Sequence, residues 1–343
     1  LGVALSLLVS ERSIFMATTT PTTASAPAPK RRGLTLAQRE ARLAYLLLIP
    51  TFLVVLLIVV FPVAWNLWLS FKPIVLRDLQ SGNLLSAANL TLRNFQRVLV
   101  GRNFWPVLQT TVIYTVFGTI LSILLGLGAA MIARDYFPGR QLFRGFLLVP
   151  YIAPIVAMAF LWRMIFNAQF GIFNEFTSTV LGWPRIDFLT QRYWKADLFG
   201  GTLQWPLALT MVILFEAWRY FPFAFLFILA RLQALPEDLY EAAAVDGAVP
   251  SQRFWYITLP QLRPVIATLV LLRFIWTFNK FDDIYLLNGG VAGTEVITIR
   301  IFDLLFGQFQ VGRAAALAVV LALFLGVFLF FYFRYVIVEE EAL

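Results

Sequence analysis

Few residue types in this chain could do chemistry. Its 343 residues include no cysteine and no histidine, which excludes thiol nucleophiles, disulfides, zinc sites built on those residues and histidine general bases. An enzyme would have to use carboxylates, serine or lysine. Asp282 and Asp283 form an adjacent acidic pair near the end of an apolar segment, but neighbouring residues on a helix point apart. A polytopic membrane enzyme is therefore the weaker alternative, and we expect no catalytic residues and no metal site.

The sequence also lacks a nucleotide-binding loop. No G-x-x-x-x-G-K-[ST] pattern occurs, so the chain has no P-loop to hold ATP phosphates. We expect no cofactor in this chain, and ATP and magnesium would be bound by a partner. Any energy that its work requires must then come from another chain.

Charged residues interrupt two otherwise apolar segments. Glu216 and Arg219 lie three positions apart, a spacing at which helical side chains can pair. A charge pair inside a membrane span indicates function, although an interfacial pair near the end of the span is an equal alternative. Arg273 cannot face lipid cheaply, so it should face a solute pathway or pair with a carboxylate such as Glu216.

Aromatic and polar residues alternate at the end of the fifth apolar segment. Sugar recognition needs aromatic faces for stacking and polar side chains for the hydroxyl groups, in a cavity within the membrane. Trp276, Asn279, Asp282 and Tyr285 recur at helical intervals and could share one face of the fifth helix. Alternatively, Trp276 and Tyr285 are interfacial anchors and Asn279 caps a helix end, or a partner subunit holds the whole solute site.

The composition is that of an integral membrane protein. The chain is 60% hydrophobic and 13% charged, with a mean hydropathy of +0.79, whereas a soluble domain carries about 25% charged residues. The formal net charge of +8 suits basic edges that face anionic lipid. No basic segment is polar enough to form a nucleic-acid-binding module, so we expect lipid and no nucleic acid as a partner.

Six apolar segments are long enough to cross a membrane, since about 20 residues span the hydrocarbon core. They are residues 43–71, 103–133, 145–166, 205–231, 262–281 and 314–333. In the second segment, Gly118, Gly126 and Gly128 offer small surfaces for close helix packing. In the third, Pro150 and Pro154 predict a kink. The predicted fold class is an all-α polytopic membrane protein with six transmembrane helices.

The two ends predict polar extensions outside the membrane. Residues 1–40 include a low-complexity stretch and should form a disordered cytoplasmic segment, with Leu1 or Met16 as the true start. A basic flank precedes the first span and places the N-terminus in the cytoplasm: Lys30, Arg31, Arg32, Arg39 and Arg42. Residues 41–336 then form the six-helix domain, and 337–343 form an acidic tail on the cytoplasmic side.

The polar segment 236–264, between the fourth and fifth apolar segments, has a helical pattern of its own. Pro236 suits the start of a helix, and Glu237 and Asp238 place negative charge where the helix dipole favours it. This helix should end at Gly247, the residue type that best adopts the left-handed conformation beyond a helix end. The three consecutive alanines before that end leave a surface without bulk.

A second short helix should follow in the same segment. Ser251 is expected to cap a turn over residues 252–257. Pro260 and Pro264 are then expected to redirect the chain into the fifth span. A short helix, a glycine corner and a second short helix on a membrane surface form a shape suited to docking.

The spacing within 236–264 strongly resembles the EAA loop of the membrane permeases of ABC importers. The string LYEAAAVDGA is similar to the form found in the carbohydrate branch of that family, the maltose, trehalose and glycerol-phosphate permease type. The residues that carry the resemblance are Glu241, Ala242, Ala243, Asp246, Gly247, Ile257, Leu259 and Pro260. The resemblance covers residues 41–336. An ordinary amphipathic loop helix between two spans is the alternative.

The resemblance implies an ABC importer type I permease fold and a role in carbohydrate import. The loop would be the coupling helix that docks on a cytoplasmic ATPase subunit, and the chain would line half of a translocation pathway. The implied partners are a second permease subunit, two ABC ATPase subunits and an extracytoplasmic solute-binding protein, at the plasma (inner) membrane of a bacterium or archaeon. A permease of the same type for glycerol phosphate, an amino acid or an inorganic ion stays open.

Overall fold

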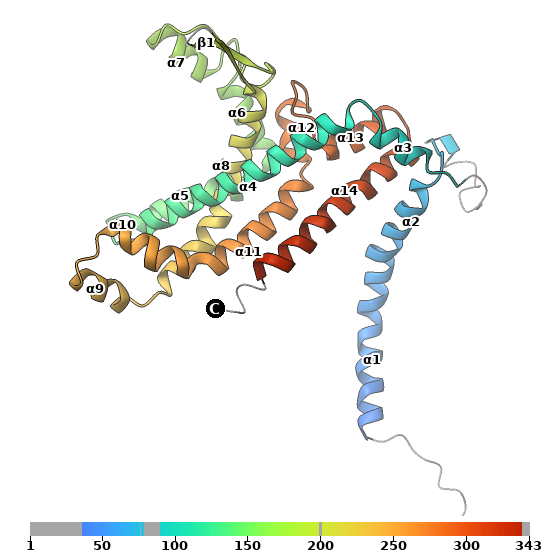
Figure 1. Ribbon diagram of the computed structural model, residues 1–343, viewed down its shortest axis with the longest axis horizontal. Helices are drawn as coiled ribbons and strands as arrows, with labels where there is room; N and C mark the ends of the chain where they lie inside the picture. The colour runs from blue at the N-terminus through green and yellow to red at the C-terminus, as the bar shows by residue number, and fades with distance from the viewer. Residues whose placement is uncertain (1–35, 76, 79–89, 199–200, 338–343) are drawn as a thin grey trace, which may run out of the picture. The chain divides into compact units, whose positions relative to one another are not determined.

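The computed structural model of the protein describes residues 36–75, 77–78, 90–198 and 201–337 (Figure 1). These residues belong to two compact units, which divide between Val59 and Val60. The expectations for residues 1–35 and 338–343 lie outside the described residues. The domain boundaries given above stay predictions.

The described residues contain five helices that are long and apolar enough to cross a membrane, and a bent helix pair raises the number to six. The five are Glu40–Ser70, Phe104–Arg134, Leu207–Gln233, Pro250–Phe278 and Val311–Tyr335. The first comprises most of α1 (Leu36–Val55), the π-helical turn η1 (Leu56–Val60) and α2 (Phe61–Ser70). The all-α, six-span prediction is confirmed in these terms. Most boundaries differ by a few residues, but the helix of the fifth span begins at Pro250 and not at residue 262.

The third span is the bent pair. Helices α5 (Arg140–Ile152) and α6 (Ile155–Ile165) meet at 96°. Ala153, between them, has an extended backbone with ψ of 147°, as expected for a residue that precedes proline. Pro154 then precedes the first turn of α6. The kink predicted from Pro150 and Pro154 is confirmed.

Helix α8 (Leu207–Gln233) packs along α4 (Phe104–Arg134), and α11 (Leu259–Phe278) also contacts α4. Glycines allow the close approach of α4 and α8. A Cβ atom at Gly126 would lie 2.7 Å from the Cβ of Ala224, and one at Gly118 would lie 3.0 Å from the Cγ of Glu216. The predicted packing role is therefore confirmed for these two glycines. Gly128 has open space beside it.

Helix α14 (Val311–Tyr332) lies beside α2, α3 (Arg93–Leu99) and α13 (Ile297–Phe302). The side chain of Asn94 joins α3 to the end of α2, because its Nδ2 donates to the carbonyl oxygens of Ser70 at 3.0 Å and Lys72 at 2.7 Å. The π-helical turns η4 (Asp303–Gly307) and η5 (Phe333–Ile337) precede and follow α14. Helices α3 and α13 also contact α4.

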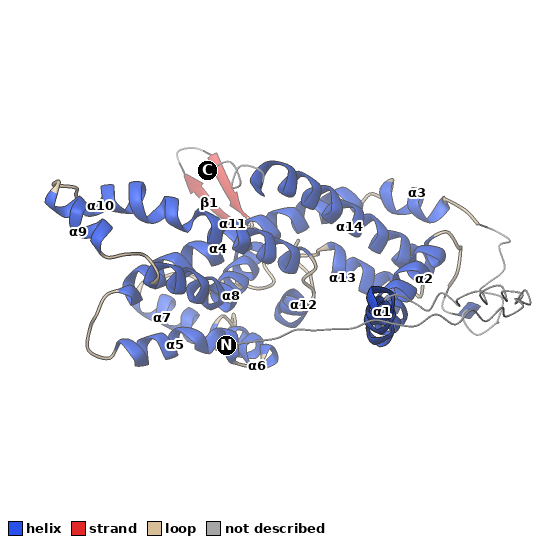
Figure 2. Ribbon diagram, turned by 90° about the horizontal axis from the view of Figure 1, so that it is seen from below, coloured by secondary structure: helices blue, strands red, loops and turns tan. Residues whose placement is uncertain are grey.

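The connection between the third and fourth spans contains structure that the sequence analysis missed. It holds α7 (Ile172–Val180) and an antiparallel hairpin of β1 (Trp194–Leu198) and β2 (Gly201–Trp205), in which Trp194 pairs with Trp205 (Figure 2). The alternation of apolar and polar residues in WKADL was the available signal.

Candidate functional site

The segment 236–264 begins with a helix of the predicted kind. Helix α9 runs over Asp238–Val245, and Gly247 beyond it has a left-handed backbone with φ of +81°. The N–H of Ala248 donates to the oxygen of Ala243 at 2.8 Å, and the N–H of Gly247 donates to that of Ala244 at 3.1 Å. These are the two hydrogen bonds of a Schellman ending, which requires the left-handed residue at the position of the glycine.

The second helix of the segment is α10 (Pro250–Arg253), but its cap differs from the prediction. Its N-cap is Val249, whose N–H donates to Oε1 of Gln252 at 2.9 Å. Ser251 lies inside the first turn, so its predicted capping role is wrong. Pro250 explains why the N-cap is Val249 and not Ser251. Its fixed φ suits the first helical residue, and it has no N–H to satisfy.

The expected redirection at Pro260 and Pro264 is also wrong. Residues 250–278 form one continuous helix of 29 residues: α10, the π-helical turn η3 (Phe254–Thr258) and α11. The N–H of Leu259 donates to the oxygen of Phe254, five residues earlier. This wider turn directly precedes Pro260, which lies in the first turn of α11 and supplies no N–H of its own.

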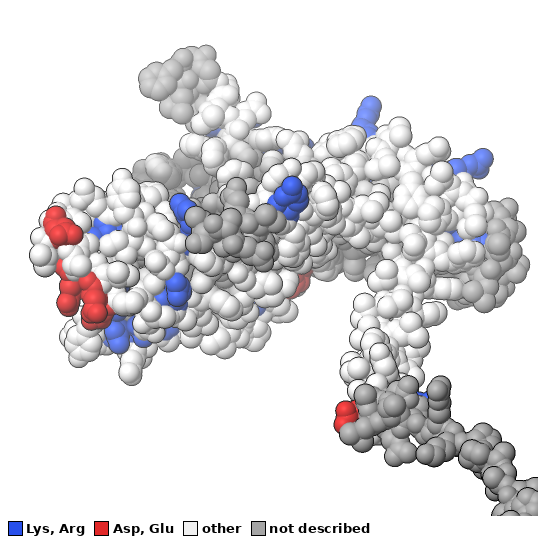
Figure 3. Space-filling view, turned by 60° about the horizontal axis from the view of Figure 1, so that its bottom comes forward, with Lys and Arg blue, Asp and Glu red and all other residues white. Residues whose placement is uncertain are grey.

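Helix α9 presents its side chains outward and has no buried residue. Glu237, Asp238, Glu241 and Asp246 are all exposed, and Val245 is 88% exposed. Figure 3 shows acidic side chains gathered where α9 lies, with basic side chains beside them. Helix α9 therefore offers an exposed and largely acidic face.

The side chain of Tyr240 joins α9 to its surroundings. Its hydroxyl lies 3.0 Å from Oγ1 of Thr258 in η3. The guanidinium of Arg134, at the end of α4, lies 4.1 Å from the centre of its ring. Helix α9 is thus connected to two membrane-crossing helices, α4 and the helix 250–278.

Half of the resemblance residues surround one hollow between α9 and η3. The hollow has a volume of about 450 Å³, and Ala243, Asp246, Gly247 and Ile257 contribute to its lining. Glu241 lines a separate groove beside the connection from α4 to α5. Ala242 is exposed, while Leu259 and Pro260 are half-buried at the start of α11.

A buried charge cluster lies where α4, α8 and α11 meet. Glu216 has no exposed surface, and Arg273 is 1% exposed. Nη2 of Arg273 lies 2.5 Å from Oε1 of Glu216. Tyr114 donates to Oε2 of the same carboxylate at 3.1 Å, and Thr277 donates to Oε1 at 2.9 Å. The predicted partnership of Arg273 with Glu216 is therefore present.

Arg219 does not pair with Glu216, so that prediction is wrong. Its Nη1 donates to the oxygens of Pro150 at 3.0 Å and Ala153 at 3.2 Å, which the bend between α5 and α6 leaves available. Its Nε lies 4.0 Å from Oδ1 of Asp283. The reason is geometric, since the carboxylate of Glu216 is already occupied by donors from α4 and α11.

The sequence analysis missed the second half of the cluster. Lys280 lies 3.5 Å from the buried carboxylate of Asp283, and its Nζ also contacts the hydroxyl of Tyr220. The centre of the Tyr220 ring lies 4.2 Å from Nζ of Lys280 and 4.5 Å from Cζ of Arg273. The spacing of Lys280 and Asp283 was a signal for such a pair.

The candidate solute residues are divided between two helices. Helix α11 ends at Phe278, and Asp282 and Tyr285 lie on α12 (Asp282–Asn288), so the four do not share one face of the fifth helix. Asn279 follows α11 directly, and its Nδ2 donates to the oxygen of Ile275 at 2.8 Å. Trp276 and Tyr285 are 45% and 44% exposed, whereas Glu216 and Arg273 offer no comparable surface.

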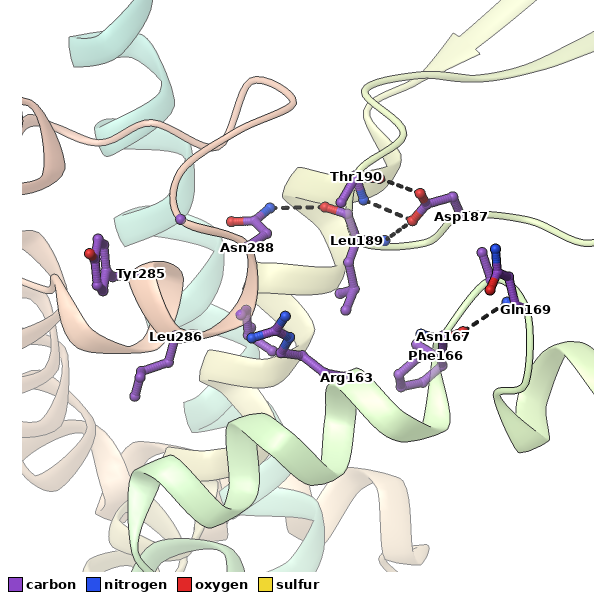
Figure 4. A pocket seen from close by; sticks show the side chains of 13 residues that line it. Arg163, Phe166, Asn167, Gln169, Asp187, Leu189, Thr190, Tyr285, Leu286 and Asn288 are labelled. Atoms are coloured by element: carbon purple, nitrogen blue, oxygen red, sulfur yellow. Dashed lines mark hydrogen bonds between the residues drawn. The ribbon is translucent and has the colours of Figure 1, made fainter.

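Tyr285 lines the edge of a cavity of about 520 Å³ between α6, the 187–190 turn and α12. Arg163 extends from α6 towards α12, as Figure 4 shows. The side chain of Asn288 donates to the oxygen of Leu189 at 3.0 Å and ties α12 to the 187–190 turn (Figure 4). The cavity therefore combines aromatic and polar groups. Of the four candidates only Tyr285 lines it, and Trp276, Asn279 and Asp282 do not.

Comparison with known proteins decides the family. The family model described as "Binding-protein-dependent transport system inner membrane component" matches residues 118–339, which include the whole of segment 236–264 and all of the buried cluster except Tyr114. The chain belongs to this family. It is a multi-pass membrane component of a transport system, and not an enzyme.

Several relatives of this permease cover most of its length. The trehalose/maltose transport system permease protein MalF of Thermococcus litoralis is 34% identical over 81% of this chain and 89% of its own. The trehalose transport system permease protein SugA of Mycobacterium tuberculosis is 31% identical over 82% of this chain and 84% of its own. A solved bacterial ABC transporter involved in alginate import contains a chain that is similar in fold, with a TM-score of 0.71, 24% identity and coverage of 86% and 95%.

Proposed function

We propose that this permease is a subunit of an ATP-driven ABC importer for a sugar or sugar-like solute, and that 236–264 is its coupling loop. The observation that carries the coupling role is the geometry of α9: an exposed helix that ends at a left-handed Gly247 and is tied to α4 and η3. The sugar assignment is supported by relatives named for trehalose and maltose transport.

The proposed assembly follows from this role. Two ABC ATPase subunits would bind ATP and magnesium and receive the α9 surface, and a second permease subunit would supply the other half of the pathway. An extracytoplasmic binding protein would deliver the solute at the opposite end. The α9 end of the molecule would then face the cytoplasm of a bacterium or archaeon, together with both chain termini.

The continuity of residues 250–278 supports a direct mechanical coupling. A helix of 29 residues is about 43 Å long at a rise of ~1.5 Å per residue. A movement of the residues that line the hollow between α9 and η3 would act on the first turns of this helix. The other end of the helix carries Arg273 and Trp276, so motion at the ATPase would reach the region of the buried cluster.

Solute contacts are proposed for the exposed candidates. Trp276 and Tyr285 would offer ring faces to a sugar, and Asn279 and Asp282 would offer hydrogen-bonding groups. Glu216 and Arg273 are given a structural role instead, because their side chains are buried against each other. A small anionic solute is the second candidate, supported by Arg163 at the cavity of Figure 4.

Glu241→Lys tests the coupling role. The exposed lysine would reverse the charge at the docking surface without disturbing a buried contact, so the complex should insert normally while sugar uptake falls at least tenfold. Uptake and ATPase activity of the reconstituted importer are the measurements. Glu175→Lys is the charge-reversal control. It removes the exposed ion pair of Glu175 with Arg185, which contributes little to stability, and should leave uptake and ATPase activity unchanged. Unaltered uptake in the Glu241 variant would contradict the assignment.

A further inference from the structure

A cavity lined by arginine side chains lies at the start of α4, the end of this helix that is distant from α9. It has a volume of about 220 Å³ and is enclosed by α3, by the first turns of α4 and α14, and by α13 and η4. Four arginines line it: Arg97, Arg102, Arg300 and Arg313. The rest of the wall is largely apolar and includes Val98, Phe104, Val107, Ile297, Leu304 and Leu317.

The positive charge of this arginine cavity is only half balanced. Arg300 lies 3.5 Å from the carboxylates of both Glu295 and Asp303. Within the described residues, no carboxylate lies within ion-pair distance of Arg97, Arg102 or Arg313. The side chain of Arg313 donates to Gln310. Its Nε is buried and makes no hydrogen bond with any described residue.

The backbone adds to the positive potential. The cavity lies at the start of α4, a helix of 31 residues, whose N-cap Asn103 makes no side-chain capping bond. The first N–H groups of a helix and its dipole favour a negative charge at this place. Arginine side chains and a helix start together match an oxyanion, and guanidinium forks match the geometry of phosphate in particular.

The position of the cavity identifies the source of the phosphate. Helices α4 and α14 both begin here and both are apolar enough to cross a membrane, so their ends lie at headgroup depth. Trp105, next to Phe104, is 64% exposed, as interfacial aromatic anchors are. Apolar wall residues below the arginines suit the glycerol and upper acyl carbons of a lipid.

We propose that the arginine cavity binds the phosphate of an anionic phospholipid and thereby joins α3, α4 and α14. A bound phosphate would neutralise the charge that the protein leaves unbalanced and would give the buried Nε of Arg313 an acceptor. This inference rests on the arginine cavity and on the membrane crossing of α4 and α14, and it stands apart from the sugar assignment.

Titration of the purified complex in neutral detergent tests the proposal. Phosphatidylglycerol should raise the thermal unfolding midpoint, whereas diacylglycerol with the same acyl chains should not. Arg313→Gln and Arg97→Gln should each weaken phosphatidylglycerol binding about tenfold, the size expected for loss of one charged hydrogen bond. Arg93→Gln is the matched control, because Arg93 lies on the same helix α3 but outside the cavity. It should leave the titration unchanged.

Three outcomes would overturn the assignment. Equal titrations for all variants would show that lipid binds elsewhere. An equal shift with inorganic phosphate would show a free-anion site, and a shift with diacylglycerol would show that acyl chains alone stabilise the protein. Arg97 is exposed, so its variant is expected to fold even if Arg313→Gln does not. Mass spectrometry of the Arg97 variant then gives an independent count of the lipid molecules that it retains.

Discussion

The coupling loop and the buried charge cluster are built on opposite principles. Helix α9 buries no residue, and its conformation is determined by local features, such as the acidic first turn and the left-handed Gly247. The cluster brings together the buried charged groups of Glu216, Arg273 and Asp283, from α8, α11 and α12. The hydroxyl of Tyr114, from α4, joins them although it lies 102 residues from Glu216 in the chain. Under the proposed function the loop offers its surface to another protein, whereas the ionic contacts of the cluster lie within this one.

This difference explains how each region can be damaged. A buried charge that loses its partner is destabilised by the full desolvation penalty. An exposed helix can lose its function while the fold persists, because its contacts with the rest of the chain are few. Mutations in the cluster should therefore act on stability, and mutations in the loop on coupling.

The largest effect is expected at the cluster. Glu216→Ala leaves the buried guanidinium of Arg273 without its carboxylate and should lower the free energy of unfolding by about 3–5 kcal/mol. The denaturation midpoint of the protein in detergent measures this loss. Glu216→Leu combined with Arg273→Met should be less harmful than the single change, since it removes both charges.

The control for this prediction is an exposed ion pair. Glu175→Ala removes the contact of Glu175 with Arg185, and these two side chains are 60% and 48% exposed, respectively. The change should lower stability by about 1 kcal/mol at most. Equal losses in the Glu216 and Glu175 variants would show that the buried cluster is not a stabilising centre of the permease.

A smaller loss is expected where α4 and α8 support the cluster. At Gly126, a new Cβ would lie 2.7 Å from the Cβ of Ala224 and 2.8 Å from the backbone nitrogen of Phe225. Gly126→Ala should therefore separate the helices and lower stability by about 1–3 kcal/mol.

Gly128→Ala is the matched control for this packing prediction, because nothing lies within 4 Å of its new methyl group. It should be neutral or slightly stabilising, since alanine is the better helix former. If both alanine variants unfold at the same midpoint, close packing of α4 on α8 is not needed.

Coupling through the loop should depend on the backbone conformation of Gly247, and not on side-chain packing. Valine at position 247 would have to adopt φ of +81°, at a local penalty of about 1–2 kcal/mol. Gly247→Val should abolish ATPase stimulation by the loaded binding protein and barely change the unfolding midpoint. Gly247→Asn should retain much of the coupling, because asparagine tolerates this conformation. Loss of coupling in both variants would point to the size of the side chain, not to the backbone.

The two regions also differ in how far sequence reasoning reaches. Helix α9 and Gly247 were predictable because proline, acidic residues and glycine act within a few positions. The kink at Pro150 and Pro154 was predictable for the same reason. The hydrogen bond of Gln252 to the N-cap Val249 was not predictable. The continuous helix through Pro260 was not predictable either, because the π-helical turn η3 accommodates this proline within the helix.

Tertiary geometry explains the remaining differences. The spacing of Glu216 and Arg219 allowed an ion pair, but donors from α4 and α11 reach the carboxylate first, and Arg219 finds carbonyl oxygens at the bend of the third span. The break of the helix after Phe278 separated Trp276 from Tyr285. No local pattern in the sequence specifies which distant helix approaches.

The smallest effect tests the contact that connects the loop to the membrane helices. Tyr240→Phe removes the hydroxyl that lies 3.0 Å from Thr258 Oγ1 but keeps the ring beside Arg134. Loss of one half-buried hydrogen bond is worth about 1 kcal/mol, so amide exchange in α9 should quicken about fivefold while global stability stays constant. Thr258→Val removes the same bond from the other side, and the double variant should exchange no faster than either single one. Additive effects would mean that the two hydroxyls act separately. The ring of Tyr240 on Arg134, and not the bond to η3, would then be what holds α9 in place.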